Sequence, residues 1–328
     1  MPKPLETVTA KWLMENPLPA RPWVVDGLLS TGLHILAGEP KVGKSWLVLQ
    51  AALCVSAGEP LWGFDTTAGT VLYLCLEDPY ERIQERLRKM GEEASDNLHF
   101  CREAATIDGG LCRQIEEFAH EHEGTILVIV DTLQMVRRYS GESMYMADYG
   151  DLSKLKKVAD DLGIAMLLVH HRRKMPDDNV FNTVSGSTGI TGTADTTMVL
   201  YEEGRAHAQR PKPASLAVTG RDTADRKLEL LFDETYHWVY LGEQGEDELE
   251  AERMPREVRA VADFALQLQE PWQGLAGELI EQAGIAGTNP VRLGRLLNAN
   301  HAALELAGVG CARRKTSRGS EIVLSRQP

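Results

Sequence analysis

Residues 38–45 carry the most specific chemical pattern in the chain. They read Gly-Glu-Pro-Lys-Val-Gly-Lys-Ser and match G-x-x-x-x-G-K-[ST] at every position, after a short apolar run and before a helical pattern. Glycines in such a loop let backbone N–H groups close around phosphates at a helix N-terminus, whose dipole favours anions. We therefore predict a phosphate-binding loop that holds a nucleotide. Its members are Gly38, Glu39, Pro40, Lys41, Val42, Gly43, Lys44, Ser45 and Trp46.

Acidic residues at the ends of two other apolar runs complete this chemistry. Asp131 ends the run ILVIVD, and Glu77 ends the run VLYLCLE. We expect Lys44 to reach the β- and γ-phosphates of ATP, while Ser45 and Asp131 hold Mg²⁺. Glu77 is predicted to polarise the attacking water. The neighbouring Asp78 could instead cap the helix that begins at Pro79.

Short apolar runs alternate with helical patterns from residue 32 to about residue 241. Nearly continuous apolar runs indicate strands buried on both faces, as in a parallel sheet covered by helices, so the fold class is α/β. Close spacing of the last strands favours antiparallel additions at one end of the sheet. The predicted strands are 34–37, 70–76, 125–131, 165–170, 197–201, 215–220 and 227–232, and the predicted helices are 45–57, 79–90, 112–121 and 146–162.

The ordered motifs between residues 23 and 232 resemble those of the RecA-like P-loop ATPases. They are most similar to the hexameric replicative helicases of the plasmid RepA type, among the AAA family ATPases. The stretches that carry the resemblance are WVVDGLL, GEPKVGKS, LYLCLEDPYERIQERL, ILVIVDTL, LLVHHRRK, SGSTGITGTADTTMVL and GRDTADRKLELLFD. The resemblance implies a RecA-like P-loop NTPase core with a mostly parallel sheet between helices. It also implies a homo-oligomer, a hexameric ring with ATP at its subunit interfaces.

Two further catalytic residues follow from the resemblance alone. The motif LLVHHRRK ends in a histidine that corresponds to a sensor of the γ-phosphate, with His171 in better register than His170. Arg221, in VTGRD, corresponds to an arginine finger that enters the ATP site of the neighbouring subunit. Both residues also have plainer interpretations. The histidines could simply end a strand at the surface, and the arginine could pair with Asp222 or Asp225.

The resemblance also places two loops at the central channel of a ring, where single-stranded DNA would pass. Residues 137–145 and 175–190 are rich in glycine and polar residues, and Arg137, Arg138, Ser185 and Ser187 are the candidate DNA contacts. Asp177 and Asp178 weaken the electrostatic case in the second loop. Surface loops without DNA contact therefore remain the alternative.

Charge and pattern change near residue 242 and divide the chain. The net charge is −13, but seven acidic residues and two arginines lie between residues 242 and 257, whereas residues 271–328 hold seven Lys/Arg against four Glu. We expect an N-terminal extension (1–22), a RecA-like ATPase domain (23–242), an acidic linker (243–257) and a small α+β domain (258–328). Helical patterns over 256–268, 274–283 and 290–307, followed by a hairpin around 317–320, predict a winged-helix-like domain.

Basic residues of this last segment are candidate contacts for DNA phosphates, although winged helices also bind proteins. The candidates are Arg313, Arg314, Lys315 and Arg318 in the hairpin, and the helix 291–300 with Arg292, Arg295, Asn298 and Asn300.

Together these features predict an ATP-dependent DNA helicase or translocase that acts on single-stranded or forked DNA. The C-terminal domain would engage duplex or a replication partner. The alternatives are a recombination or loading ATPase that does not unwind DNA, and an ATP-switched DNA-binding regulator. No apolar run is long enough to span a membrane, the N-terminus lacks a secretory pattern, and five cysteines show no metal spacing, so we expect a cytoplasmic protein with reduced thiols.

Overall fold

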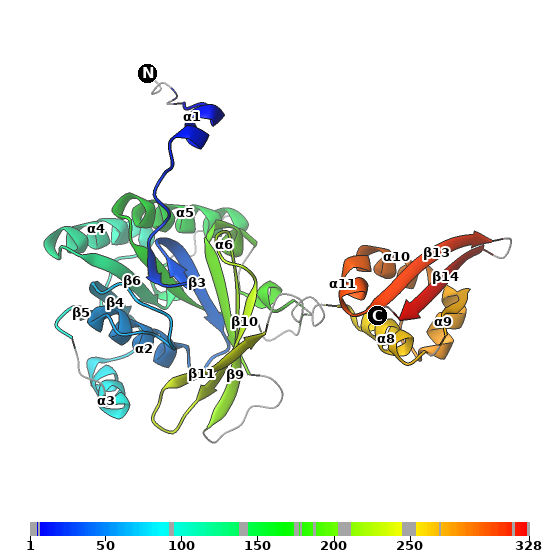
Figure 1. Cartoon of the computed structure of the whole chain (residues 1–328). Helices are drawn as coiled ribbons and strands as arrows, with labels where there is room; N and C mark the ends of the chain where they lie inside the picture. The colour runs from blue at the N-terminus through cyan, green and yellow to red at the C-terminus, as the bar shows by residue number, and fades with distance from the viewer. Residues whose placement is uncertain are drawn as a thin grey trace.

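The structure is a computed structural model of the 328-residue chain. It describes residues 5, 7–91, 95–137, 144–173, 177, 179–185, 188–202, 211–244, 254–268, 270–316 and 319–326. Its largest feature is a nine-stranded sheet with the order β11-β10-β9-β8-β3-β7-β6-β4-β5 (Figure 1). The strands from β8 to β5 in this order run parallel, and β9, β10 and β11 are antiparallel additions at one end. This arrangement confirms the predicted α/β fold class.

The element bounds follow the predicted pattern closely where the apolar runs are long. The strands of the large sheet are β3 (Gly32–Gly38), β4 (Thr70–Cys75), β5 (Leu98–Cys101), β6 (Thr125–Asp131), β7 (Ala165–His171), β8 (Thr196–Tyr201), β9 (Lys212–Gly220), β10 (Arg226–Phe232) and β11 (Trp238–Gln244), and a small hairpin is formed by β1 (Trp23–Val25) and β2 (Leu29–Ser30). The helices in this part are α1 (Ala10–Glu15), α2 (Lys44–Ala57), α3 (Tyr80–Met90), α4 (Leu111–Glu121), α5 (Met144–Leu162) and α6 (Thr188–Thr193), with 3-10 turns at Ile107–Gly109, Leu133–Val136 and Val180–Thr183.

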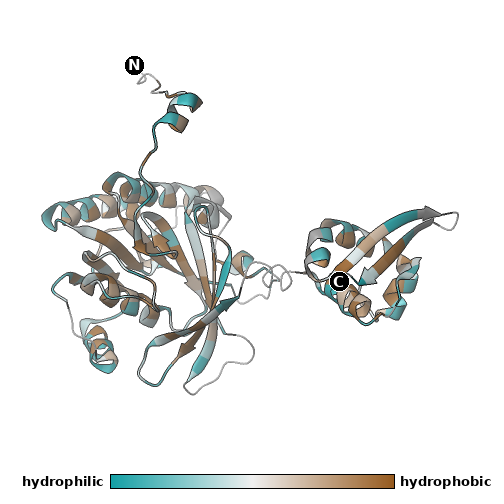
Figure 2. Ribbon diagram, in the orientation of Figure 1, coloured by the Kyte–Doolittle hydropathy of each residue, from teal (hydrophilic) through white to brown (hydrophobic). Residues whose placement is uncertain are grey.

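Helices cover both faces of the sheet, which explains why its central strands are apolar throughout. Residues of α2 and α3 join one hydrophobic cluster with one face of the strands, and residues of α4 and α5 join a second cluster with the other face. Figure 2 shows the same division, with hydrophobic strands between helices whose outer faces are hydrophilic. Helix α2 differs from the other helices because it buries residues around most of its circumference.

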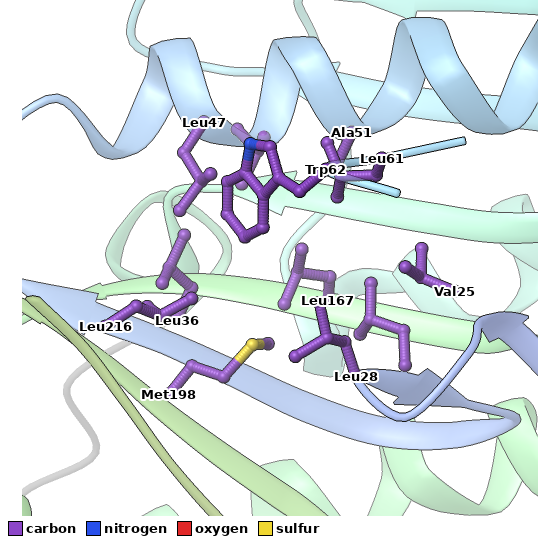
Figure 3. Close-up of a pocket in the computed structure, with 12 residues that line it drawn as sticks. Val25, Leu28, Leu36, Leu47, Ala51, Leu61, Trp62, Leu167, Met198 and Leu216 are labelled. Carbon is purple, nitrogen blue, oxygen red and sulfur yellow. The ribbon is translucent and has the colours of Figure 1, made fainter. Parts of the chain in front are cut away.

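A small apolar void lies between α2 and the sheet (Figure 3). Its volume is about 30 Å³, close to the space of one water molecule, but its walls are aliphatic and aromatic side chains that offer a water no partners. Leu47 and Ala51 of α2 form one side, and Leu36, Leu167 and Met198 of the sheet form the other. We therefore expect this void to be dry.

Two strands of the sheet were not predicted. β5 is short and only half buried, and β11 alternates between buried and exposed residues in a stretch that also carries charges. Both lie at the edges of the sheet, where one face or one side of the strand meets solvent, so their sequences lack the apolar run that marked the central strands.

The residues from 254 onward form a hydrophobic cluster of their own. Its elements are α8 (Arg256–Leu266), β12 (Trp272–Leu275), α9 (Ala276–Gln282), α10 (Pro290–Ala299), α11 (His301–Leu306), β13 (Val309–Thr316) and β14 (Gly319–Arg326), with the sheet order β12-β14-β13. The hairpin is as predicted, with Thr316 opposite Gly319. The single helix predicted over 290–307 is wrong, because Asn300 donates from both its backbone and its side chain to the Leu296 carbonyl and ends α10.

Within the described residues, no helix is both long and apolar enough to cross a membrane. All five cysteines are free thiols.

His34 in the centre of β3 makes the stability of the sheet depend on pH. Its side chain is fully buried, and its Nε2 donates to the Ser30 carbonyl at 2.7 Å. Burial disfavours the charged imidazole and lowers its pKa from 6.5 to about 4. Below pH 6.5 the unfolded chain therefore binds a proton that the folded chain does not, and about 3 kcal/mol of stability is lost as the pH falls from 6.5 towards 4.

We predict that His34→Gln removes this part of the pH dependence, because glutamine donates a similar hydrogen bond but does not titrate. Urea unfolding at a series of pH values between 7.5 and 4 measures it. The matched control is His120→Gln, at an exposed position on α4, which should keep the wild-type slope. Equal slopes for wild type and His34→Gln would contradict the prediction.

Candidate active site

The carboxyl ends of four parallel strands place the predicted residues around one pocket. Gly38 pairs with His171, and Cys75 pairs with Asp131, so the ends of β3, β7, β6 and β4 lie at the same edge of the sheet. The pocket there has a volume of about 520 Å³, within the range of small-molecule sites. It is lined by Pro40, Lys41, Gly43, Lys44, Ser45, Trp46, Cys75, Glu77, Asp78, Arg82, Arg86, Asp131, Thr132 and His171.

The predicted loop joins β3 to α2 and depends on glycine at the position just before the helix begins. Gly43 has a φ of +114°, a conformation that favours glycine, and α2 starts at the next residue. A Cβ on Gly43 would lie only 2.7 Å from the ring of Trp238. The loop is therefore a concave backbone at a helix N-terminus, as anion binding requires. Of the nine predicted loop residues, Val42 is buried away from the pocket, and Glu39 pairs with Arg172 at 3.1 Å.

Lys44 is a buried cation whose charge is not matched by an ion pair among the described residues. Its Nζ donates to the carbonyls of Gly38 and Glu39, each at 2.9 Å, and the residue is only 7% exposed. Burial lowers the pKa of Lys44, while the charges of Asp131 and Glu77 oppose that shift. An anionic phosphate at the loop would supply the missing counter-charge, so this lysine fits a nucleotide.

Asp131 lies at the end of β6, where its carboxylate meets two hydroxyl groups. The Tyr73 hydroxyl donates to Oδ2 at 2.9 Å, and the Ser45 hydroxyl donates to the same carboxylate. Burial raises the pKa of Asp131, these two hydrogen bonds oppose the shift, and the charges of Glu77 and Asp78 add to it. Oxygen ligands beside clustered carboxylates suit Mg²⁺. Ser45 and Asp131 would hold that ion.

Glu77 follows β4 and faces the same pocket. The Thr132 hydroxyl donates to its Oε1 at 2.7 Å, which leaves the second carboxylate oxygen free of that bond and fixes the direction of the side chain. A carboxylate held in this way can orient a water molecule towards a phosphate.

The prediction that Asp78 caps the following helix is wrong. Pro79 is the N-cap residue of α3, and no side chain caps that helix. The Asp78 carboxylate instead accepts a hydrogen bond from Arg82 at 2.6 Å and forms an ion pair with Arg86, also at 2.6 Å. This pairing holds the two arginines at the pocket wall, where Arg86 also lies over the ring of Trp46 at 5.4 Å.

The two histidines of β7 have different surroundings. His171 lines the pocket, and its Nδ1 has no hydrogen-bond partner in the part of the chain that the structure describes. His170 is buried, and its Nε2 donates to the Ser185 carbonyl at 2.8 Å, while the Ser185 N–H donates to the His171 carbonyl at 3.0 Å. Burial lowers the pKa of His170. The geometry thus distinguishes a residue that faces the nucleotide pocket from one that fastens the following loop.

Arg221 lies at the opposite end of the sheet from the pocket. Its N–H donates to the Asp195 carbonyl, and Asp195 adjoins Leu33 at the amino end of β3. The seven residues of β3 separate this point from the loop by roughly 20 Å. The Asp195 carboxylate, not Asp222, lies near the Arg221 guanidinium at 3.7 Å, and it also binds Lys156 at 2.5 Å. The Arg221 side chain is 56% exposed.

The candidate DNA contacts in the two loops have different surroundings. The Arg137 guanidinium binds Asp148 at 2.5 Å and Asp151 at 2.9 Å and is mostly buried, so its charge is paired within the chain, and its predicted contact with DNA phosphate stays a prediction. Ser185 is half buried and its backbone is committed to the histidines. Arg138 and Ser187 lie outside the described residues.

In the segment from residue 254 onward, Arg292 and Arg313 are exposed but have partners within the fold. Arg313 donates to the Gly294 carbonyl on α10, and Arg292 pairs with Glu257 at 3.0 Å, so both are engaged within the fold. Arg295 and Arg314 are exposed. The side chain of Lys315 and the whole of Arg318 lie outside the described residues.

Comparison with known proteins agrees with this geometry. Residues 2–177, more than half of the chain, match the protein family described as AAA domain. The chain belongs to the AAA domain family. The DNA repair protein RadA of Streptococcus pneumoniae is 26% identical over 184 residues, which cover 55% of this chain and 38% of RadA. The chain therefore spans well under half the length of that relative.

Two solved structures share the fold of this AAA domain protein. The ATPase domain of G40P has a TM-score of 0.51 at 15% identity, over 65% of this chain and 85% of that domain. A DnaB-like replicative helicase, described with its interactions with primase, has a TM-score of 0.54 at 15% identity, over 70% of this chain and 66% of the helicase. At such identities the likeness shows the fold, which is that of a RecA-like P-loop ATPase.

Several residues that shape the site were missed by sequence reasoning. Tyr73 lies within the apolar run of β4, and Thr132 directly follows the apolar run of β6, so neither was recognised as a residue of the site. Arg82 and Arg86 had a visible signal, because they are spaced at i+4 and i+8 from Asp78, but that spacing is also common on a solvated helix face.

We predict that Tyr73→Phe raises the Mg²⁺ concentration needed for half-maximal nucleotide hydrolysis by about 10- to 100-fold, because Asp131 loses the donor that orients and charges it. A Mg²⁺ titration at fixed nucleotide measures this. Tyr80→Phe is the matched control, since the Tyr80 hydroxyl donates to the Phe100 carbonyl and does not line the pocket. Superimposable titrations for Tyr73→Phe and wild type would show that the hydroxyl does not act on the metal site.

Proposed function

We propose that this AAA domain protein is an ATP-dependent DNA helicase or translocase of the replicative RepA type, which works as a ring. ATP would be hydrolysed between subunits, and single-stranded DNA would pass through the centre. The pocket supports the nucleotide part of this proposal, because it combines a buried unpaired lysine, a carboxylate beside a serine, and a second, oriented carboxylate.

The observation that carries the ring is the position of Arg221. It lies roughly 20 Å from the pocket of its own chain, at the amino end of β3, with more than half of its side chain exposed. An arginine so far from its own nucleotide can stabilise the developing phosphoryl charge only in another subunit. Within its own chain the Arg221 guanidinium lies 3.7 Å from the Asp195 carboxylate and donates to the Gly192 carbonyl at 2.9 Å, and it would exchange these contacts for a phosphate of the neighbouring subunit.

The residues of the pocket divide the chemistry among them. Lys44 and the backbone of the loop would bind the β- and γ-phosphates, and Glu77 would orient the attacking water and accept its proton. Mg²⁺, held by Ser45 and Asp131, would neutralise phosphate charge. His171 would contact the γ-phosphate from the end of β7.

Coupling to DNA would run through the backbone link at Ser185. His170 precedes the proposed sensor His171, and its side chain donates to the Ser185 carbonyl. The Ser185 N–H in turn donates to the His171 carbonyl. A shift of His171 with the state of the phosphate would therefore move Ser185. This link favours a motor over a passive nucleotide switch.

We assign residues 23–242 to the ATPase domain and 258–328 to a winged-helix-like domain joined by the acidic linker. The order of α8, β12, α9, α10, α11, β13 and β14 supports this assignment. Arg295 and Asn298 share the exposed face of α10, and Arg314 is exposed on β13, so these residues are the best candidates for contact with duplex DNA. The alternative is that this domain binds a replication partner.

The printed descriptions of the similar proteins fit a role on DNA, one being a repair protein and one a replicative helicase that interacts with primase. The rival function is a recombination or loading ATPase that does not unwind DNA. An ATP-switched regulator would bind DNA without stimulation of hydrolysis.

The deciding experiment measures ATP hydrolysis and strand displacement together on forked DNA, with Lys44→Ala as the blank. We expect unwinding that requires ATP and Lys44, because the lysine binds the phosphates in every step. Hydrolysis stimulated by DNA without displacement would instead establish the recombination or loading function. Hydrolysis that ignores DNA would establish the regulator.

We predict that Arg221→Ala lowers ATP hydrolysis by about 10³-fold or more while nucleotide binding is unchanged. Mixing Arg221→Ala with Lys44→Ala should restore part of the activity, because Lys44→Ala subunits lend an intact arginine to the ATP that Arg221→Ala subunits hold. Arg113→Ala, at an exposed arginine on α4, is the control. A mixture no more active than its two components would contradict an arginine that acts between subunits.

A further inference from the structure

Trp238, the first residue of β11, contacts the phosphate-binding loop at Gly43. Its indole is fully buried, and its Nε1–H donates to the Gly43 carbonyl at 3.2 Å. The ring also fills the space that a side chain on Gly43 would need, with Cζ2 only 2.7 Å from the ideal Cβ position. A residue from the far edge of the sheet, almost two hundred positions later in the sequence, therefore sets one boundary of the loop.

The Gly43 carbonyl accepts three hydrogen bonds. The N–H groups of Trp46 and Leu47 donate to it at 3.1 Å each, and the indole of Trp238 is the third donor. Gly43 is the N-cap residue of α2, and no side-chain cap is present there. A capping side chain would accept from the first N–H groups of α2, whereas the indole adds a donor to the carbonyl of the N-cap residue and leaves those N–H groups available.

Fixing this carbonyl also fixes the next N–H group. The Gly43 C=O and the Lys44 N–H belong to one planar peptide unit and point in opposite directions. With the carbonyl held towards Trp238, the Lys44 N–H points out of the helix and into the pocket. It is one of the first N–H groups of α2, which have no partner within the helix and are the donors that bind anions.

Trp238 is itself held in place from several sides. Gln50 of α2 accepts from the Trp238 backbone N–H at 2.9 Å and donates to its carbonyl at 3.1 Å. The Trp62 indole donates to the same carbonyl at 2.6 Å, and Figure 3 shows this ring between α2 and the sheet. The ring of Phe232 stacks on Trp238 at 4.9 Å. The indole therefore cannot shift without moving α2 or the β10–β11 hairpin.

We propose that Trp238 is a positioning residue for the phosphate chain of the bound nucleotide. Its indole N–H aims the peptide between Gly43 and Lys44 so that the Lys44 N–H is ready to donate to a phosphate oxygen. The proposal rests on the proposed nucleotide binding, and it assigns to the edge strand β11 a function that its place in the sheet does not otherwise require.

The test is Trp238→Phe, which keeps an aromatic ring next to Phe232 but removes the donor. We expect the affinities for ADP and for inorganic tripolyphosphate to fall together by about 2- to 10-fold, the effect of one lost hydrogen bond. The KM for ATP should rise by the same factor with kcat little changed, because the N–H binds phosphate in the ground state and in the transition state alike. Competition with a fluorescent ADP analogue measures both affinities.

The matched control is Trp272→Phe, whose indole donates to Gln282 in the cluster from residue 254 onward and should leave both affinities unchanged. Gln50→Ala is the second variant. It keeps the indole but removes its backbone support, so we expect the same direction of change. Because tripolyphosphate has no base or sugar, its weaker binding marks an effect on phosphate positioning and not on the whole pocket.

The outcomes separate the two proposals. A wild-type chain that binds neither ADP nor tripolyphosphate would overturn the proposed function itself. A wild-type chain that binds both, together with variants at Trp238 and Gln50 that melt at the wild-type temperature and bind both ligands equally well, would overturn the role of Trp238. A fall in kcat at constant KM would also overturn it, because that pattern belongs to a transition-state contact.

Discussion

The burial of helix α2 is the constraint on which the rest of the molecule depends. Leu47, Val48 and Leu49 point in different directions around this helix, and each is buried. A helix enclosed on several sides cannot rotate or slide, so its first turn is fixed relative to the ends of the parallel strands. Strand ends that carry Glu77 and Asp131 then need only a few hydroxyl contacts to complete a polar pocket on a rigid base.

The fold could be predicted from sequence where local pattern and burial agree. The central strands are apolar because both of their faces are covered, and this produced runs that were easy to recognise, such as residues 125–131. The edge strands carry no such run. The division of residues 290–307 into two helices depends on the side chain of Asn300, and such a local hydrogen bond leaves the helical periodicity unchanged.

The candidate site could be predicted where one short motif contains the chemistry, as in the phosphate-binding loop. Pairings between distant segments were not predictable. Arg137 looked like a free cation in a polar loop, but two carboxylates that lie one turn apart on α5 bind it. Asp195 was not singled out at all, yet it lies near cations from several segments, Arg21, Lys156 and Arg221. A sequence does not show which charges will meet, because that depends on the packing of the whole sheet.

The strand order has a consequence for the synthesis of this protein. β3 is the first strand of the large sheet to be made, but its neighbours on either side are β7 and β8, which follow more than a hundred residues later. A nascent chain that has just released residues 38–45 from the ribosome therefore has no sheet on which to fix them, and Trp238 emerges later still. Bound nucleotide can therefore help the ATPase fold to form only after most of the large sheet has been synthesised. Until then the apolar segments of β3 and α2 are exposed to chaperones and to aggregation.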